Sequence, residues 1–172
     1  MKAVLIIAPI WYQDIEYLDT KAELEKAGIE VITAAKKAGI CKGKLGGTAQ
    51  ATLSIDNINV EDYDAIVFIG GPGAVRHQED VQAQITAQEA ITEQKVLAAI
   101  CIAPTILAKA GVLEGKKATV WNEDGLQDQL LEQEGATYTG ETVTIDGKII
   151  TANGPQAAKD FGKAIVKALN VK

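Results

Sequence analysis

Short runs of apolar and β-branched residues alternate with longer segments of helical periodicity along the chain. Such runs are typical of strands that are covered on both faces, and they cover residues 3–8, 29–34, 65–69, 96–100 and 117–121. The helical segments cover residues 14–27, 79–95, 104–110 and 125–134, and a last helix opens at Pro155. This alternation predicts βαβ units with right-handed crossovers, and therefore an α/β fold with a mostly parallel sheet between two helical layers. Since no linker or internal repeat interrupts the pattern, we expect one domain over residues 1–172.

Two segments depart from the alternation and predict hairpins. Residues 41–55 form a polar excursion around Gly46 and Gly47, which is typical of two short strands joined by a turn. Residues 142–151 contain two β-branched runs separated by Asp146-Gly147, a signal for a type I′ turn.

The helical periodicity also predicts which side chains face the sheet. In the first helix Ile15, Leu18 and Ala22 share one face. The helix over residues 79–95 is expected to bury Val81, Ile85 and Ile91, and the last helix Phe161, Ala164, Ile165 and Ala168.

Composition limits the partners that the chain can have. The net charge of −6 and the scattered lysines provide no basic face, so we expect no nucleic acid partner. No apolar stretch approaches the roughly 20 residues that a bilayer-spanning helix needs, and the first run has neither a basic leader nor a cleavage pattern. We therefore expect a cytoplasmic protein without membrane contact, whose two cysteines are free thiols.

The most informative residue is Cys101. The segment Ala99-Ile100-Cys101-Ile102-Ala103 has the small-x-nucleophile-x-small pattern of a nucleophile elbow, between a predicted strand and a predicted helix. The N–H groups and the dipole at the start of that helix favour a thiolate over a thiol. The alternative is a buried structural cysteine, which is common. The pattern and its context together favour the reactive interpretation.

In a parallel sheet the site lies beyond the carboxyl ends of the strands, and two further loops are expected there. The glycines that begin with Gly70 and Gly71 would let main-chain N–H groups approach a reacting oxygen, although a plain turn has the same composition. Glu16, near the start of the first helix, is either a solvated first-turn acid or a carboxyl facing Cys101 that could hold and move a proton. His77, the single histidine, is expected to be a loop residue and less readily a base for Cys101.

Cofactor motifs are missing from the sequence. The glycine loop lacks the Lys and Ser/Thr of a phosphate loop and is not G-x-G-x-x-G. Cys41 has no partners at metal-ligand spacing and no elbow around it. We therefore expect neither a cofactor nor a metal.

Taken together, the Cys101 elbow, the glycines after residue 69, and the Asp14-Ile15-Glu16 helix start resemble the ThiJ/PfpI superfamily, which includes parkinsonism-associated deglycases and archaeal intracellular proteases. The segment over residues 146–155 resembles the C-terminal signature of that family. The resemblance spans the whole chain. It implies a flavodoxin-like three-layer sandwich related to class I glutamine amidotransferase domains, and it implies homodimers or larger assemblies.

Carried over by position, the resemblance makes Cys101 the nucleophile and Glu16 the carboxyl that contacts it. It makes the N–H groups of Gly70 and Gly71 neighbours of the sulfur, and the elbow places the N–H of Ile102 there as well. Ile102 stands where the protease branch has His, which argues against peptidase chemistry. Trp121 stands where the deglycase branch often has His, and it cannot act as a base.

Three functions stay open on this basis. The first is a stress-related enzyme of glyoxalase III or deglycase type, in which the Cys101 thiolate adds to a small reactive carbonyl. The second is an oxidant sensor, in which Cys101 oxidises to a sulfinate without turnover. The third is a peptidase or amidase, which would need a base such as His77 or a residue of another subunit.

Overall fold

A seven-stranded sheet forms the centre of the computed structural model, which describes residues 1–170. The strand order is β11-β12-β8-β7-β1-β3-β6, and every neighbouring pair is parallel except β11 with β12. Its strands are β1 (Lys2–Ile6), β3 (Glu30–Ala35), β6 (Leu53–Ser54), β7 (Ala65–Phe68), β8 (Val96–Ile100), β11 (Val143–Asp146) and β12 (Ile149–Ala152). The predicted parallel sheet is confirmed.

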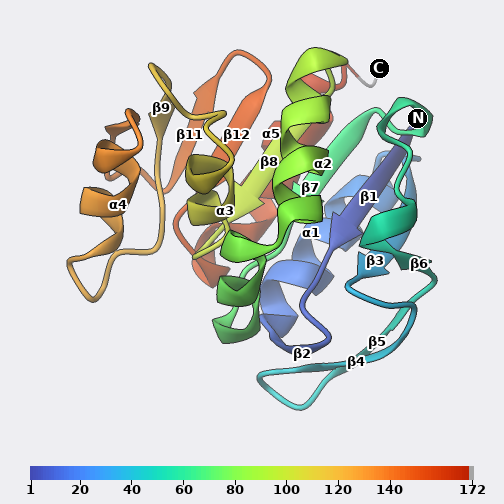
Figure 1. Cartoon of the computed structure of the whole chain (residues 1–172). Coiled ribbons are helices and arrows are strands. Elements are labelled where there is room, and N and C mark those ends of the chain that lie inside the picture. Colours follow the sequence, from blue (N-terminus) through green and yellow to red (C-terminus); the bar gives the residue numbers. More distant parts are fainter. Residues whose placement is uncertain (171–172) are drawn as a thin grey trace.

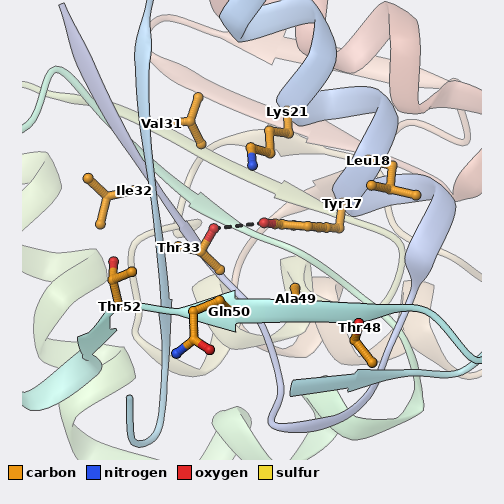
Figure 2. Close-up of a pocket in the computed structure, with 10 residues that line it drawn as sticks. All are labelled: Tyr17, Leu18, Lys21, Val31, Ile32, Thr33, Thr48, Ala49, Gln50 and Thr52. Atoms are coloured by element: carbon orange, nitrogen blue, oxygen red, sulfur yellow. Dashed lines mark hydrogen bonds between the residues drawn. The ribbon is translucent and has the colours of Figure 1, made fainter. Parts of the chain in front are cut away.

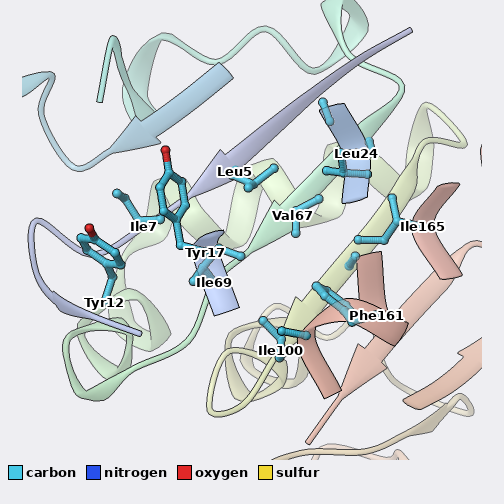
Figure 3. Packing of buried hydrophobic residues seen from close by; sticks show 14 of the residues in the cluster. Leu5, Ile7, Tyr12, Tyr17, Leu24, Val67, Ile69, Ile100, Phe161 and Ile165 are labelled. Carbon is cyan, nitrogen blue, oxygen red and sulfur yellow. The ribbon is translucent and has the colours of Figure 1, made fainter. Parts of the chain in front are cut away.

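Helices cover both faces of this sheet (Figure 1). Helices α1 (Asp14–Lys26) and α5 (Ala158–Ala168) pack against each other on one face, and α2 (Val81–Thr92) and α3 (Pro104–Lys109) cover the other. Along β1 the side chains alternate, so that Leu5 joins the cluster under α1 and α5 (Figure 3), whereas Val4 joins the cluster under α2 and α3. The molecule is therefore a flavodoxin-like three-layer sandwich, as the resemblance implies.

Smaller elements surround the sheet. Strands β2 (Ile10–Tyr12), β4 (Gly39–Gly43) and β5 (Thr48–Ala51) form a three-stranded sheet at one end, in which β4 and β5 are the predicted hairpin. Strands β9 (Lys117–Ala118) and β10 (Thr137–Tyr138) pair beside α4 (Gln127–Gln133). The remaining turns are the 3₁₀ helices η1 (Ile55–Asn57), η2 (Val60–Asp62), η3 (Pro72–Glu79) and η4 (Pro155–Ala157).

The second predicted hairpin is confirmed, but its turn type differs from the expectation. Asp146 pairs with Ile149, so the two turn residues are Gly147 and Lys148. Only Gly147 has a positive φ, of 61°, whereas a type I′ turn requires positive φ at both positions.

Two of the predicted helix faces are wrong. On α1 the exposed side carries Ile15 and Leu18, and the helix buries Glu16 instead. On α2 the large residues Val81, Ile85 and Ile91 are exposed, and the helix packs on the sheet through small residues, namely Ala83, Ala87 and Ala90. The prediction failed because it assigned the bulky apolar side chains of both segments to the core, whereas α2 packs through small side chains and α1 through a different face that includes Tyr17 and Leu24. The prediction for α5 holds for Phe161 and Ile165, which are fully buried.

Within residues 1–170, the structure contains no helix with the length and apolarity that crossing a bilayer requires.

Candidate functional site

Cys101 lies at a sharp turn directly after β8. Its φ of +63° is unusual for a residue with a side chain, and strained main-chain geometry of this kind is found at nucleophile elbows. Two main-chain bonds hold the turn: the Cys101 N–H donates to the carbonyl of Ala152 (2.8 Å), and the Cys101 carbonyl accepts from the Trp121 N–H (2.8 Å). The turn runs into α3, which begins at Pro104. The predicted strand–turn–helix context is therefore present.

The glycine loop after β7 lies against this turn. A Cβ on Gly70 would come within 2.6 Å of the Cys101 Cβ and 2.7 Å of Glu16 Oε2, so only glycine fits between the two side chains. Gly71 has a φ of +103°, which glycine adopts without strain. The N–H groups of Gly71 and Ile102 lower the pKa of the Cys101 thiol. Gly70 differs from the expectation, because its N–H donates to Glu16 and not to the sulfur.

Glu16 is fully buried on the inner side of α1. Its Oε2 accepts the Gly70 N–H at 3.0 Å, and its Oε1 has no hydrogen-bond partner in the described structure. Burial raises the pKa of Glu16 to about 8, against the opposing effects of Cys101, the Gly70 N–H and the charge of Lys44. Near neutral pH the protonated, uncharged carboxyl is therefore the more populated form.

The same burial acts on the thiol. The pKa of Cys101 is raised above its usual value, first by burial and then by the negative charge of ionised Glu16, while the N–H groups of Gly71 and Ile102 oppose the shift. Since protonation of Glu16 removes that charge, the two groups titrate as a pair. Loss of one proton leaves a single negative charge on the pair. This charge can reside either on the Glu16 carboxylate or on the Cys101 thiolate.

A second carboxyl near the start of α1, on Asp14, anchors the β4–β5 hairpin. Its two oxygens accept the N–H groups of Leu45 and Gly47, each at 2.7 Å, and so attach the tip of the β4–β5 hairpin to the start of α1. A Cβ on Gly43 or Gly47 would collide with this carboxyl. From the sequence alone Asp14 is predicted only at the helix start, because its contacts with the hairpin glycines are long-range.

Trp121 and His77 were the other two predicted pocket residues, and the structure separates them. Trp121 is half-buried, and its main-chain N–H donates to the Cys101 carbonyl. His77 is buried in η3, where its Nδ1 lies 3.7 Å from Asp80 Oδ2, and Lys36 Nζ lies 3.0 Å from the same oxygen. Burial lowers the pKa of His77. Among the described residues, no hydrogen bond or ion pair joins His77 to Cys101.

Cys41 lies apart from this constellation. It is buried in β4, and burial raises the pKa of its thiol. Its neighbour Tyr12 packs edge-on against Tyr17, with ring centroids 5.5 Å apart. Both cysteines are free.

A surface hollow of about 380 Å³ lies between α1, β3 and β5 (Figure 2). Its floor carries a hydrogen bond of 2.8 Å between the Tyr17 hydroxyl and Thr33 Oγ1. Leu18 and Gln50 line its rim, and Cys101 is not part of it. Within residues 1–170, no three His, Cys, Asp or Glu side chains gather closely enough to bind a metal ion.

The chain is similar to known proteins over nearly its whole length. The profile of the DJ-1/PfpI family matches residues 1–168. An uncharacterised protein of Methanocaldococcus jannaschii is 36% identical over 98% of this chain and 82% of its own length. The deglycase PfpI of Pyrococcus furiosus is 30% identical over 96% of this chain and 98% of its own.

Solved structures show the same likeness. The ThiJ/PfpI domain protein of Brachyspira murdochii superimposes with a TM-score of 0.94 at 31% identity, covering 98% of this chain and 96% of that one. Oxidized DJ-1 of Toxoplasma gondii superimposes with a TM-score of 0.87 at 28% identity, covering 99% and 91%. The elbow cysteine, the glycine loop and the whole-length match lead to one conclusion: this chain belongs to the DJ-1/PfpI family.

Proposed function

We propose that the protein is a cytoplasmic stress enzyme that converts small 2-oxoaldehydes, such as methylglyoxal, into 2-hydroxy acids through a covalent Cys101 intermediate. The deglycase names of several relatives support an activity on carbonyl adducts in this family. The observation that carries the proposal is the buried Glu16 carboxyl beside Cys101, because it can hold a proton near neutral pH and exchange it with the reacting atoms.

The first step forms a carbon–sulfur bond. The pair begins with Glu16 as carboxylate and Cys101 as thiol, and Glu16 takes the thiol proton as the sulfur attacks the aldehyde carbon. The electron pair of the C=O bond moves to oxygen, where the N–H groups of Gly71 and Ile102 stabilise the developing charge. Glu16 delivers its proton to that oxygen, which gives a hemithioacetal and leaves Glu16 as carboxylate.

The second step moves hydrogen within the substrate. Glu16 carboxylate removes the proton from the former aldehyde carbon, and the electron pair passes through an enediol to the neighbouring ketone, which is reduced to an alcohol. The former aldehyde carbon is thereby oxidised to a thioester. Water then hydrolyses the thioester and releases the 2-hydroxy acid and the thiol, so that one water is consumed per turnover and no external oxidant is needed.

Consumption of methylglyoxal by the purified protein tests this proposal. We expect formation of lactate that is lost in Cys101→Ser and retained in Cys41→Ser, since Cys41 lies away from the site. Equal rates for Cys101→Ser and the wild-type protein would refute the covalent role of Cys101.

Oxidant sensing is a second candidate, supported by the unpartnered Oε1 of Glu16. Peroxide would oxidise the Cys101 thiolate to a sulfenate and then to a sulfinate, with one water formed from each peroxide. A protonated Glu16 and the N–H groups of Gly71 and Ile102 would bind the new oxygens. Intact mass after mild peroxide tests this, because the candidate requires two added oxygens on Cys101, and oxygen gained at Cys41 alone would eliminate it.

We further propose that the protein forms a homodimer or larger assembly through the exposed side of α1. Leu18 is 58% exposed there and borders the hollow of Figure 2, which could receive an apolar side chain of a second copy. Strand β5, which also lines the hollow, lies at the end of its sheet. This face therefore combines an apolar protrusion with a matching recess, as an isologous interface requires.

A further inference from the structure

Trp11 has a main-chain conformation that its side chain makes costly. Its φ is +64°, in the left-handed region, where a bulky aromatic residue is a genuine outlier. The pairing of β2 with β4 also shifts register between Ile10 and Tyr12, which marks a bulge at Trp11. Bulges of this kind are common beside binding sites, where they change the direction of a side chain.

The surrounding structure imposes this conformation on Trp11. The Gln13 N–H donates to the Gly70 carbonyl at 3.0 Å, and the Tyr12 carbonyl accepts the Lys44 N–H at 2.8 Å, so β2 is held between the glycine loop and the hairpin. A Cβ on Gly71 would come within 2.5 Å of the Trp11 carbonyl oxygen. Main-chain strain that its neighbours enforce is a reason to look for function at that residue.

Packing does not account for the choice of tryptophan. Its side chain is 57% exposed, and the preceding Ile10 is exposed as well. Glycine would adopt the same φ without strain, and a polar residue would cost less on the surface. The chain therefore carries a large apolar ring at a strained position where the folded protomer leaves most of it uncovered.

The position of Trp11 relates it to the thiol. Its carbonyl lies against Gly71, and the preceding Gly70 lies against the Cys101 side chain. On the other side of the elbow, the main-chain N–H of Trp121 donates to the Cys101 carbonyl. The two tryptophans of the chain thus belong to the two segments that border the elbow.

We propose that Trp11 is a specificity-determining residue of the Cys101 site, and that it favours carbonyl substrates with an aryl or similarly large planar apolar substituent. This inference rests on the proposed carbonyl chemistry. While Cys101 and the main-chain N–H groups act on the aldehyde, the indole of Trp11 contacts the substituent and excludes water from it. A methyl group is too small to gain from this contact, so Trp11 separates aryl from methyl 2-oxoaldehydes.

Competing substrates of two sizes provide the first test. The ratio of kcat/KM for phenylglyoxal to that for methylglyoxal is expected to fall about tenfold in Trp11→Gly, mainly through a higher KM for phenylglyoxal. Trp11→Phe keeps a ring and should retain most of the ratio. Ile40→Ala removes an exposed apolar side chain from the same small sheet and should leave the ratio unchanged. Trp11→Gly is expected to fold, because glycine relieves the strain at that φ.

Alkylation provides a second readout that does not depend on turnover. We expect phenacyl bromide to modify Cys101 faster, relative to iodoacetamide, in the wild-type protein than in Trp11→Gly, again by about tenfold. Unchanged ratios in Trp11→Gly would overturn the role of Trp11, whether or not the protein turns over a carbonyl. Selective alkylation that depends on Trp11, in a protein that converts neither aldehyde, would support the role of Trp11 and refute the proposed enzyme.

Discussion

Cys101 and Glu16 compete for one proton, because Glu16 is fully buried, Cys101 is partly buried, and each charge disfavours the other. Burial is the leading cause of both shifts, and it moves the pKa of Glu16 to about 8 and that of Cys101 upward. The N–H groups at the elbow act in the opposite sense, since they stabilise a thiolate. A pair with these properties needs no histidine to hold and return a proton near neutral pH, which fits a site where His77 lies elsewhere.

Replacing Glu16 with Gln should reveal the cost of burying its charge. The folded protein keeps the Glu16 proton up to about pH 8, whereas the unfolded chain releases it near pH 4.5. The stability that the protonated carboxyl contributes is therefore complete below pH 4.5 and is lost as the pH rises toward 8. Between about pH 5 and pH 8, urea titrations should show the free energy of unfolding of the wild-type protein falling, relative to Glu16→Gln, by an amount on the order of a few kcal/mol. A difference between the two proteins that is independent of pH would contradict this.

At the scale of elements, the site is assembled where β1, β7 and β8 end. Each strand is followed by a segment that carries one component, namely Glu16, the glycine loop or Cys101. Parallel βαβ connectivity puts the carboxyl ends of these strands at one edge of the sheet, so the sequence predicts both the parallel sheet and this grouping. Local patterns were sufficient for the elbow because its small residues are adjacent in the chain.

The same local sequence patterns could not predict long-range contacts. The bonds from Asp14 to the N–H groups of Leu45 and Gly47 join positions more than thirty residues apart, and no helical or strand period encodes them. The faces of α1 and α2 were predicted wrongly for a related reason. Periodicity identifies the apolar side of a helix, but the surface against which that side packs is decided by the assembly of the whole chain.

The Asp14 clamp makes a prediction about the hairpin. Asp14→Ala leaves two N–H groups without their acceptor and should lower the free energy of unfolding by about 3 kcal/mol, since hydrogen bonds to charged groups are the stronger class. Hydrogen exchange at the Leu45 and Gly47 amides should accelerate in this variant. Asp19→Ala, on the same helix, serves as the control and should leave both amides protected. Equal protection in the two variants would show that the hairpin does not depend on the clamp.

At the scale of the whole molecule, α1 and α2 lie on opposite faces of the sheet (Figure 1). Each exposes a large apolar side chain, Leu18 on α1 and Val81 on α2. Only the α1 side adjoins the hollow of Figure 2. If a second copy covers α1, the two surfaces should differ in their effect on assembly.

Sedimentation of two matched variants tests this difference. Leu18→Lys places a charge in the proposed interface and should shift the protein to monomers, because an unpaired buried charge strongly disfavours association. Val81→Lys carries the same substitution at a side chain that is 67% exposed, and should sediment like the wild-type protein. Dissociation by Val81→Lys alone would assign the interface to α2 instead.

The central claim is that Cys101 and Glu16 act as one proton-sharing pair. The pH dependence of the rate of Cys101 alkylation, measured by intact mass, tests it most directly. In the wild-type protein the rate should rise with a midpoint near pH 8, as the pair loses its first proton, and rise again at higher pH as the second proton leaves. Glu16→Gln should lose the first transition and keep a single one. Superimposable profiles for the two proteins would contradict the account.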